Sequence, residues 1–269
     1  MMEFTKFEEQ VFLTTVRIEN LTDNEVGTGF FIKKPIKAGF EQILLFSNKH
    51  VFWGKADMLK QNISKNLRIT MHRKEPGGGY TLGTTHTFDF ELKRNNLGYS
   101  EHPDINVDVA CLNISDAANK GIPLHYKAID TENFFNFARG DISSGERIIF
   151  VGYPTGFYDQ ANFLPILRTG TIASIPSVDF NGKSQILIDA QVFPGSSGSP
   201  VFVPVNGHYK LLGIISEAFY KGLDFVEIVD ANQKEELKIK MPTQWIGLGL
   251  LYTSETLKAV YDLVVYNET

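Results

Sequence analysis

The chain has 269 residues, of which 43% are hydrophobic and 21% are charged, and its net charge is −5. This composition excludes an intrinsically disordered chain, because enough apolar surface is present to fill a core. The acidic balance argues against a general nucleic-acid partner, which needs clustered Lys and Arg side chains to displace counterions from phosphates.

Short apolar or alternating segments bounded by Gly, Pro, Asn and Asp recur along the chain, and this pattern is typical of an all-β protein. Eleven segments are predicted strands: residues 12–19, 27–32, 42–48, 67–73, 81–90, 109–114, 146–154, 167–175, 185–190, 199–205 and 209–219. Their number suits two six-stranded antiparallel β-barrels better than an alternation of strands and helices. We place an N-terminal barrel in residues 1–125 and a C-terminal barrel in residues 126–269, because a Gly-Ile-Pro step and a polar stretch lie near that boundary.

One helix is predicted near the end of the chain. Leu257, Val260, Tyr261 and Val264 follow one another at helical spacing, and Ser254 is available to cap the first turn. Earlier in the chain, the glycines of residues 75–80 suit a hairpin turn between the predicted strands 67–73 and 81–90.

Small residues crowd around a serine in the segment 189–203, between two predicted strands. Gly195 can adopt a backbone conformation closed to other residues, so that its N–H and that of Ser197 point at one spot where an oxyanion would form. Gly198 leaves room for a substrate chain. Taken alone, the segment is also compatible with an ordinary Gly/Ser turn before a strand.

A serine hydroxyl is inert at neutral pH and needs a base whose tautomer is fixed by a partner. His50 directly follows an apolar strand, a position that suits a side chain projecting into a cleft. The other histidines lack this setting: His72 and His86 lie within predicted strands, and His102, His125 and His208 lie in polar loops.

An acidic residue stands immediately before the predicted strand 109–114. A carboxylate at Asp108 would be held rigidly at the rim of a core, where a histidine N–H is a fitting partner for it. Asp104 and Asp116 are the alternatives for this position.

Three blocks of sequence resemble the motifs of chymotrypsin-like serine peptidases, and they occur in that family's order of His, Asp and Ser: Ser47–Val51, Asp108–Leu112 and Gly195–Pro200. The sequence of these blocks is most similar to that of the peptidase domains of bacterial high-temperature-requirement (HtrA-like) proteases. Further segments resemble the early strand, the strand that opens the second barrel and the last strand of that fold: Gly27–Ile32, Gly145–Pro154 and Gly247–Leu251.

This resemblance implies a serine endopeptidase with two chymotrypsin-like barrels. Ser197 would be the nucleophile, His50 the general base and Asp108 the residue that orients it, and the turn of Gly195, Ser196 and Ser197 would form the oxyanion hole. A neutral base implies that activity falls below pH of roughly 6.5.

The resemblance also assigns substrate-binding residues. Segment 213–218, which contains Ser216, Glu217 and Ala218, would pair with an extended substrate. Gln191 would lie at the base of the first specificity pocket, and since it is uncharged no strict preference for Lys or Arg is indicated. Val192 and Ala218 favour a narrow apolar pocket, whereas Glu217 and Asp224 would favour a basic residue.

One departure from secreted relatives concerns activation. Ser196 stands where many of them carry an aspartate that pairs with a newly cut N-terminus. We therefore expect constitutive or partner-controlled activity, with a regulatory protein as a possible partner besides the protein or peptide substrate. No metal or organic cofactor is required by this chemistry. The competing functions are a catalytically silent peptide-binding or scaffolding module and an esterase acting through the same residues.

The expected compartment follows from three features. Acidic residues occupy the N-terminus where a signal peptide needs a basic end, and apolar runs such as residues 43–46 are far shorter than the ~20 residues of a membrane helix. Cys111 is the only cysteine, so no intramolecular disulfide can form, and the thiol is expected to be buried and inert. We expect a soluble cytoplasmic protein with no membrane partner.

Overall fold

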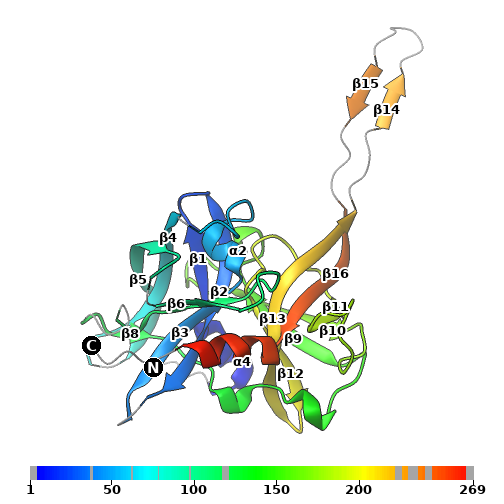
Figure 1. Cartoon of the computed structure of the whole chain (residues 1–269). Coiled ribbons are helices and arrows are strands. Elements are labelled where there is room, and N and C mark those ends of the chain that lie inside the picture. Colours follow the sequence, from blue (N-terminus) through cyan, green and yellow to red (C-terminus); the bar gives the residue numbers. More distant parts are fainter. Residues whose placement is uncertain are drawn as a thin grey trace.

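The computed structural model contains two β units that lie side by side, with a helix across the seam between them (Figure 1). The structure describes residues 5–36, 39–61, 63–77, 79–96, 98–116, 121–221, 226–229, 236–239 and 244–264. The eleven predicted strands are all found in it as β-strands.

The first unit is a curled antiparallel sheet in the order β5-β4-β1-β2-β3-β7-β6, and β8 pairs with β4. Its strands are β1 (Thr15–Asn20), β2 (Glu25–Pro35), β3 (Glu41–Ser47), β4 (Ser64–Lys74), β5 (Tyr80–Lys93), β6 (Tyr99–Glu101), β7 (Ala110–Asn113) and β8 (Leu124–His125). The sheet wraps around an apolar cluster that includes Ile18, Leu45, Trp53 and Leu67.

The prediction of six strands for this unit is wrong, because its described residues form eight. The two strands that the sequence did not indicate, β6 and β8, have three and two residues. Among the described residues β5 and β6 are the edges of the sheet, and in β5 only Leu92 is fully buried, so most side chains of this edge strand are accessible to solvent. The predicted hairpin turn is confirmed: β4 and β5 pair across it, with Glu75 N–H donating to Gly79 O at 2.6 Å. Closure of this unit into a barrel stays a prediction.

The second unit is a closed six-stranded antiparallel barrel, as predicted, in the order β10-β11-β16-β13-β12-β9. The strands are β9 (Arg147–Gly152), β10 (Ile166–Ile172), β11 (Gln185–Asp189), β12 (Pro200–Val205), β13 (His208–Lys221) and β16 (Gln244–Thr253). Buried side chains from all six strands fill its interior, among them Phe150, Ile188 and Leu251. Beyond the barrel, on the extension of β13 and β16, the strands β14 (Val226–Val229) and β15 (Glu236–Ile239) pair as a separate antiparallel ribbon (Figure 1).

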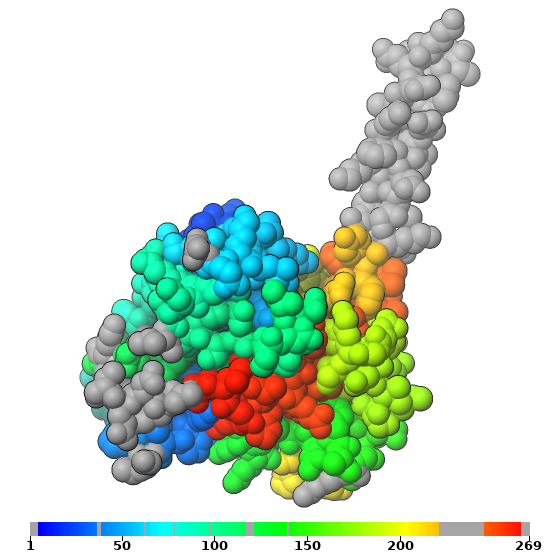
Figure 2. All heavy atoms as spheres, in the orientation of Figure 1, coloured from blue at the N-terminus to red at the C-terminus, as the bar shows by residue number. Residues whose placement is uncertain are grey.

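The predicted C-terminal helix is confirmed as α4 (Ser254–Leu263). In Figure 2 this red helix lies on the surface between the blue-to-green residues of the first sheet and the yellow-green residues of the barrel. The capping role expected of Ser254 is not found: Thr253 is the N-cap residue, and the Ser254 hydroxyl donates to Phe135 O at 2.9 Å instead.

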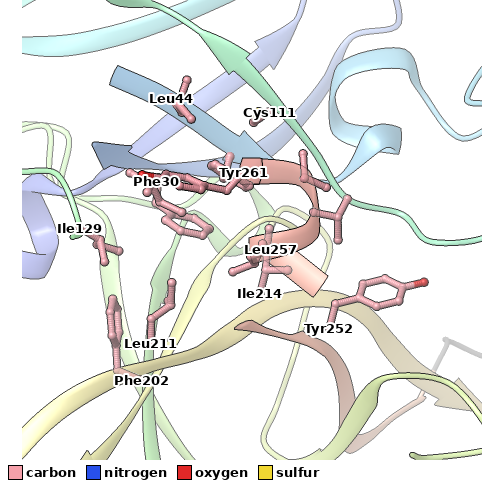
Figure 3. Packing of buried hydrophobic residues seen from close by; sticks show 14 of the residues in the cluster. Phe30, Leu44, Cys111, Ile129, Phe202, Leu211, Ile214, Tyr252, Leu257 and Tyr261 are labelled. Atoms are coloured by element: carbon pink, nitrogen blue, oxygen red, sulfur yellow. The ribbon is translucent and has the colours of Figure 1, made fainter. Parts of the chain in front are cut away.

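Below α4 an apolar cluster joins the two units. Figure 3 shows Leu257 of the helix against Ile214 of β13, and Phe30 of β2 near Tyr261. Because this cluster draws side chains from both units, separating them would expose a large apolar surface to water. The division of the chain at residues 125 and 126 stays a prediction.

The other helical elements that lie wholly within the described residues are short. They are α1 (Phe7–Gln10), α2 (Lys49–Trp53) and the 3₁₀ turns Val11–Leu13, Thr131–Asn133, Phe137–Arg139 and Pro154–Gly156. Phe135 is buried, and its ring packs edge-on against that of Phe137 at 4.7 Å, so the aromatic residues near position 135 belong to the core.

Candidate active site

His50 and Asp108 form a close pair at the seam between the units. His50 lies in α2, directly after β3, and Asp108 stands two residues before β7, which pairs with β3. His50 Nδ1 is 2.5 Å from Asp108 Oδ2, and the His50 backbone N–H donates to Asp108 Oδ1 at 3.0 Å. The amide of Asn48 donates to the backbone carbonyl of Asp108 at 2.7 Å. Both carboxylate oxygens of Asp108 are thus bonded to His50, one to its backbone and one to its ring.

The alternative acids and bases are engaged elsewhere. Asp104 Oδ1 accepts from the backbone and side-chain amides of Asn106, so this carboxylate is not directed at His50. The ring of His72 lies 2.9 Å from Asn162 O, and His102 Nδ1 accepts from Asp104 N–H at 3.1 Å. Within the described part of the chain, Asp116 forms no hydrogen bond or ion pair with a histidine.

Ser197 lies in the glycine-rich turn between β11 and β12. Gly195 and Gly198 have φ of 85° and 87°, in the left-handed region that favours glycine. A Cβ atom on Gly195 would lie 2.4 Å from Tyr153 O, so the turn is packed too tightly for a side chain there. Ser196 is buried, and its N–H donates to Phe193 O at 3.0 Å.

The peptide group between Pro194 and Gly195 is oriented by a neighbouring loop. Pro194 O accepts from Thr155 N–H at 2.5 Å, and the chain has no cis peptide bond in its described part. Because C=O and N–H point in opposite directions in a trans peptide, the Gly195 N–H is directed away from Thr155.

His50 and Ser197 line the same cleft, which has a volume of about 610 Å³. Among the described residues no hydrogen bond joins the Ser197 hydroxyl to the His50 ring, a common situation in free enzymes, where such bonds tighten on substrate binding.

Four of the predicted substrate-binding residues line the cleft: Val192, Ser216, Glu217 and Ala218. Gln191 does not line the cleft and is exposed. Asp224 lies outside the described residues.

Sequence reasoning missed an aromatic wall in the cleft. The rings of Phe193 and Tyr220 both contact Trp245, at centroid distances of 5.9 and 5.5 Å. Arg168 lies behind this wall, with its guanidinium 4.9 Å from the Phe193 ring. These four residues come from four different strands or turns, and only the position of Phe193 next to the Pro-Gly-Ser turn could have drawn attention to it.

Cys111 was expected to be a buried, inert thiol. It is fully buried in the shared core, and burial raises the pKa of the thiol to about 12. Since the thiolate is the nucleophilic form, Cys111 is unreactive at neutral pH. Separately, none of the described helices is long and apolar enough to cross a membrane.

The chain is similar to known peptidases in both sequence and fold. A family model described as a trypsin-like peptidase domain matches residues 27–214. Among solved structures, the chain is similar to Deg5, with 16% identity, a TM-score of 0.51 and coverage of 98% of this chain and 99% of that one. It is also similar to the HtrA-type protease AlgW solved with a tripeptide, with 14% identity, a TM-score of 0.53 and coverage of 96% of this chain and 62% of that one.

Proposed function

This chain belongs to the trypsin-like peptidase family and is a serine protease, and we propose that Ser197, His50 and Asp108 are its catalytic triad. The observation that carries the proposal is the pairing of His50 Nδ1 with Asp108 Oδ2 at 2.5 Å, on the wall of a cleft that also holds Ser197. A carboxylate in this position fixes the tautomer of the imidazole, so that Nε2 is free to accept a proton.

The reaction proceeds in two halves. In the first, His50 takes the proton of the Ser197 hydroxyl while the oxygen attacks a peptide carbonyl, and the protonated imidazole then donates to the leaving amine. The product of this half is an acyl-enzyme on Ser197. In the second half, His50 activates a water molecule that releases the acid and restores the hydroxyl.

The oxyanion that forms in each half needs donors that are already in place. We infer that the N–H groups of Gly195 and Ser197 supply them. The proposal is supported by the anchoring of Pro194 O on Thr155, which leaves the Gly195 N–H free to face the cleft. Ser196 lies between the two donors, and its buried side chain supports the turn and is not a ligand of the oxyanion.

Substrate would bind as an extended chain along β13. The carbonyl of Ile215 accepts from Gly198 N–H, and the Ile215 N–H donates to Ser199 O. Beyond Ile215 the strand pairs, as far as the chain is described, with β16 on one side only. The segment Ser216–Ala218 therefore offers a free strand edge beside Ser197, and main-chain pairing to it tolerates many side chains.

The side chain that precedes the scissile bond would meet an apolar wall. Val192, Phe193 and Trp245 line the cleft, and its acidic members Glu25 and Glu217 are both exposed to solvent. A buried acid at the base of the pocket is absent among the described lining residues, so we propose a preference for apolar residues over Lys and Arg at this position.

Covalent labelling with a fluorophosphonate tests the triad. We expect an adduct on Ser197 that disappears in Ser197→Ala and weakens strongly in His50→Ala. Ser199→Ala is the matched control, since its hydroxyl is buried two residues away and lies outside the cleft. Labelling that persists in Ser197→Ala would refute the assignment.

A silent peptide-binding module and an esterase are the competing functions. Absence of labelling in the folded wild-type protein would favour the first of them. Comparison of a casein-type protein with a simple ester as substrates tests the second, because hydrolysis of the ester alone contradicts peptidase activity. A cytoplasmic location and a regulatory protein partner remain proposals, which fractionation of cells and affinity capture with Ser197→Ala protein would examine.

A further inference from the structure

We propose that Thr28, on β2 of the first sheet, is a positioning residue. It holds the Gly195–Gly198 turn of the second unit, which carries Ser197 and is called the nucleophile turn below, in the backbone conformation that the reaction needs. The inference rests on the proposed triad and adds a residue from outside it. Thr28 is fully buried, and every polar atom of the residue is engaged with a segment that carries part of the active site.

Two of its bonds reach the nucleophile turn directly. The Thr28 N–H donates to Ser197 O at 2.9 Å, and the Thr28 hydroxyl donates to Gly195 O at 2.8 Å. The turn is thus held on both sides of Ser196, at the peptide group that follows Gly195 and at the one that follows Ser197.

Two further bonds connect Thr28 to neighbouring segments. Its hydroxyl accepts from Tyr153 N–H at 3.0 Å, just before the loop in which Thr155 binds Pro194 O. Its carbonyl accepts from the Ser47 hydroxyl at 2.6 Å, at the end of the strand that leads into His50. One residue therefore links the segment that carries the base, the nucleophile turn and the loop that orients the Gly195 N–H.

The packing around Thr28 leaves little freedom for this arrangement to shift. A Cβ atom on Gly198 would lie 1.8 Å from Thr28 O, and one on Gly152 would lie 2.8 Å from Thr28 Oγ1. Both glycines let backbone approach Thr28 closely enough for the hydrogen bonds to form.

The hydroxyl is the group that matters in this proposal, because it donates and accepts at the same time. Valine has the same shape but would leave the Gly195 carbonyl and the Tyr153 N–H without their partner in a buried site. The Gly195 peptide groups could then rotate, and the oxyanion donor would lose its fixed direction. Serine keeps the hydroxyl and lacks only a methyl group.

The test compares Thr28→Val with Thr28→Ser by steady-state kinetics on a peptide substrate. We expect Thr28→Val to lower kcat by about 10- to 100-fold, below the effect of deleting an oxyanion donor outright, with KM changed by less than about threefold. Thr28→Ser should keep kcat within about threefold of wild type. The affinity for a peptide aldehyde, which forms a tetrahedral adduct, should fall in parallel with kcat in Thr28→Val.

The matched control is Thr70→Val, which removes a hydroxyl from a buried threonine of the same sheet that bonds to Thr87 and lies away from the cleft. It should leave kcat unchanged. If Thr28→Val does not fold, Thr28→Ala is compared with Thr28→Ser instead. Alanine and serine differ only by the hydroxyl, and neither places a new methyl group at the position of the threonine hydroxyl. Wild-type kcat in Thr28→Val, or equal losses in the valine and serine variants, would overturn the inference. A wild-type protein that is not labelled at Ser197 would instead overturn the triad on which the inference rests.

Discussion

The ammonium of Lys49 is buried beside His50 and donates to the backbone carbonyl of Asp104 at 3.2 Å, with a second bond to His102 O at 3.3 Å. These carbonyls belong to the loop that runs directly into Asp108. Burial lowers the pKa of Lys49, and the negative charges of Glu101 and Asp108 offset this only in part. A lowered lysine pKa means that the charged form is less stable in the folded protein than in water, so Lys49 costs folding free energy at neutral pH.

We therefore predict opposite effects of Lys49→Met on stability and on activity. The melting temperature should stay the same or rise, because a desolvated charge is replaced by an apolar side chain of similar length. The value of kcat/KM should fall about tenfold, because the loop before Asp108 loses its anchor. Thermal unfolding and peptide hydrolysis measure the two effects, with Lys93→Met, a lysine whose side chain is 55% exposed, as the control. A variant with unchanged kcat/KM would contradict the role given to Lys49.

A second prediction concerns the glycine of the nucleophile turn. Gly195→Ala and Gly207→Ala both place a side chain at positive φ, 85° and 79°, and both should pay a strain of about 1–2 kcal/mol. Only at Gly195 would the new Cβ meet backbone, 2.4 Å from Tyr153 O, whereas nothing lies within 4 Å at Gly207. We expect Gly195→Ala to lose about 100-fold or more in kcat, since the turn must move away from the oxyanion, and Gly207→Ala to keep wild-type kinetics.

Equal activity of these two variants in a steady-state assay would show that the shape of the turn at Gly195 is not needed. Circular dichroism confirms that both are folded before their kinetics are compared. Loss of activity in both variants would point to general strain and against a specific role of Gly195.

Much of the fold could be predicted from periodicity, since apolar strands and the spacing of Leu257, Val260 and Tyr261 are local properties of the chain. The order of His50, Asp108 and Ser197 likewise pointed to the candidate site. Two features lay beyond this reasoning. The short helix α2 that presents His50 has five residues, too few for a helical pattern to emerge. The role proposed for Thr28 depends on partners as far as 169 positions away, which no local pattern contains.

The specificity pocket illustrates the same limit. The family resemblance predicts that Val192 and Ala218 belong to the pocket, and both line the cleft. It predicts the same for Gln191, which does not line the cleft, because side-chain direction in a turn depends on backbone angles that the sequence alone does not show. The contact of Phe193 with Trp245 joins β16 to the turn and depends on strand register, which is set by pairing across the whole barrel.

The core beneath α4 gives a prediction for stability alone. Leu257 is fully buried in the cluster that joins the two units. Leu257→Ala should lower the free energy of unfolding by about 2–5 kcal/mol, because it removes buried methyl groups and leaves a cavity. Lys258→Ala, next to it on the exposed face of the helix, should change stability by less than ~0.5 kcal/mol. Urea unfolding measures both. A loss below about 1 kcal/mol in Leu257→Ala would mean that α4 does not hold the units together.

The last prediction concerns acid stability and rests on His125. Its ring stacks on that of Tyr80 at 3.6 Å, and burial, with smaller contributions from His72, Lys74 and Lys127, lowers its pKa from 6.5 to about 4. Between these two values the unfolded chain binds a proton that the folded protein does not. The free energy of unfolding therefore decreases as the pH falls from 6.5 towards 4, and this contribution stops changing below that range.

The full shift of the His125 pKa would correspond to a larger loss of free energy of unfolding. Because His125 is only partly buried, we expect its ring to contribute about 1–2 kcal/mol to this loss. His125→Gln should unfold in urea with a smaller difference between pH 7 and pH 4.5 than the wild-type protein, because glutamine does not titrate. His208→Gln, at an exposed histidine of the β12–β13 hairpin, is the matched control and should keep the wild-type difference. Identical pH dependence in wild type and His125→Gln would mean that His125 is protonated in the folded state as readily as in the unfolded chain.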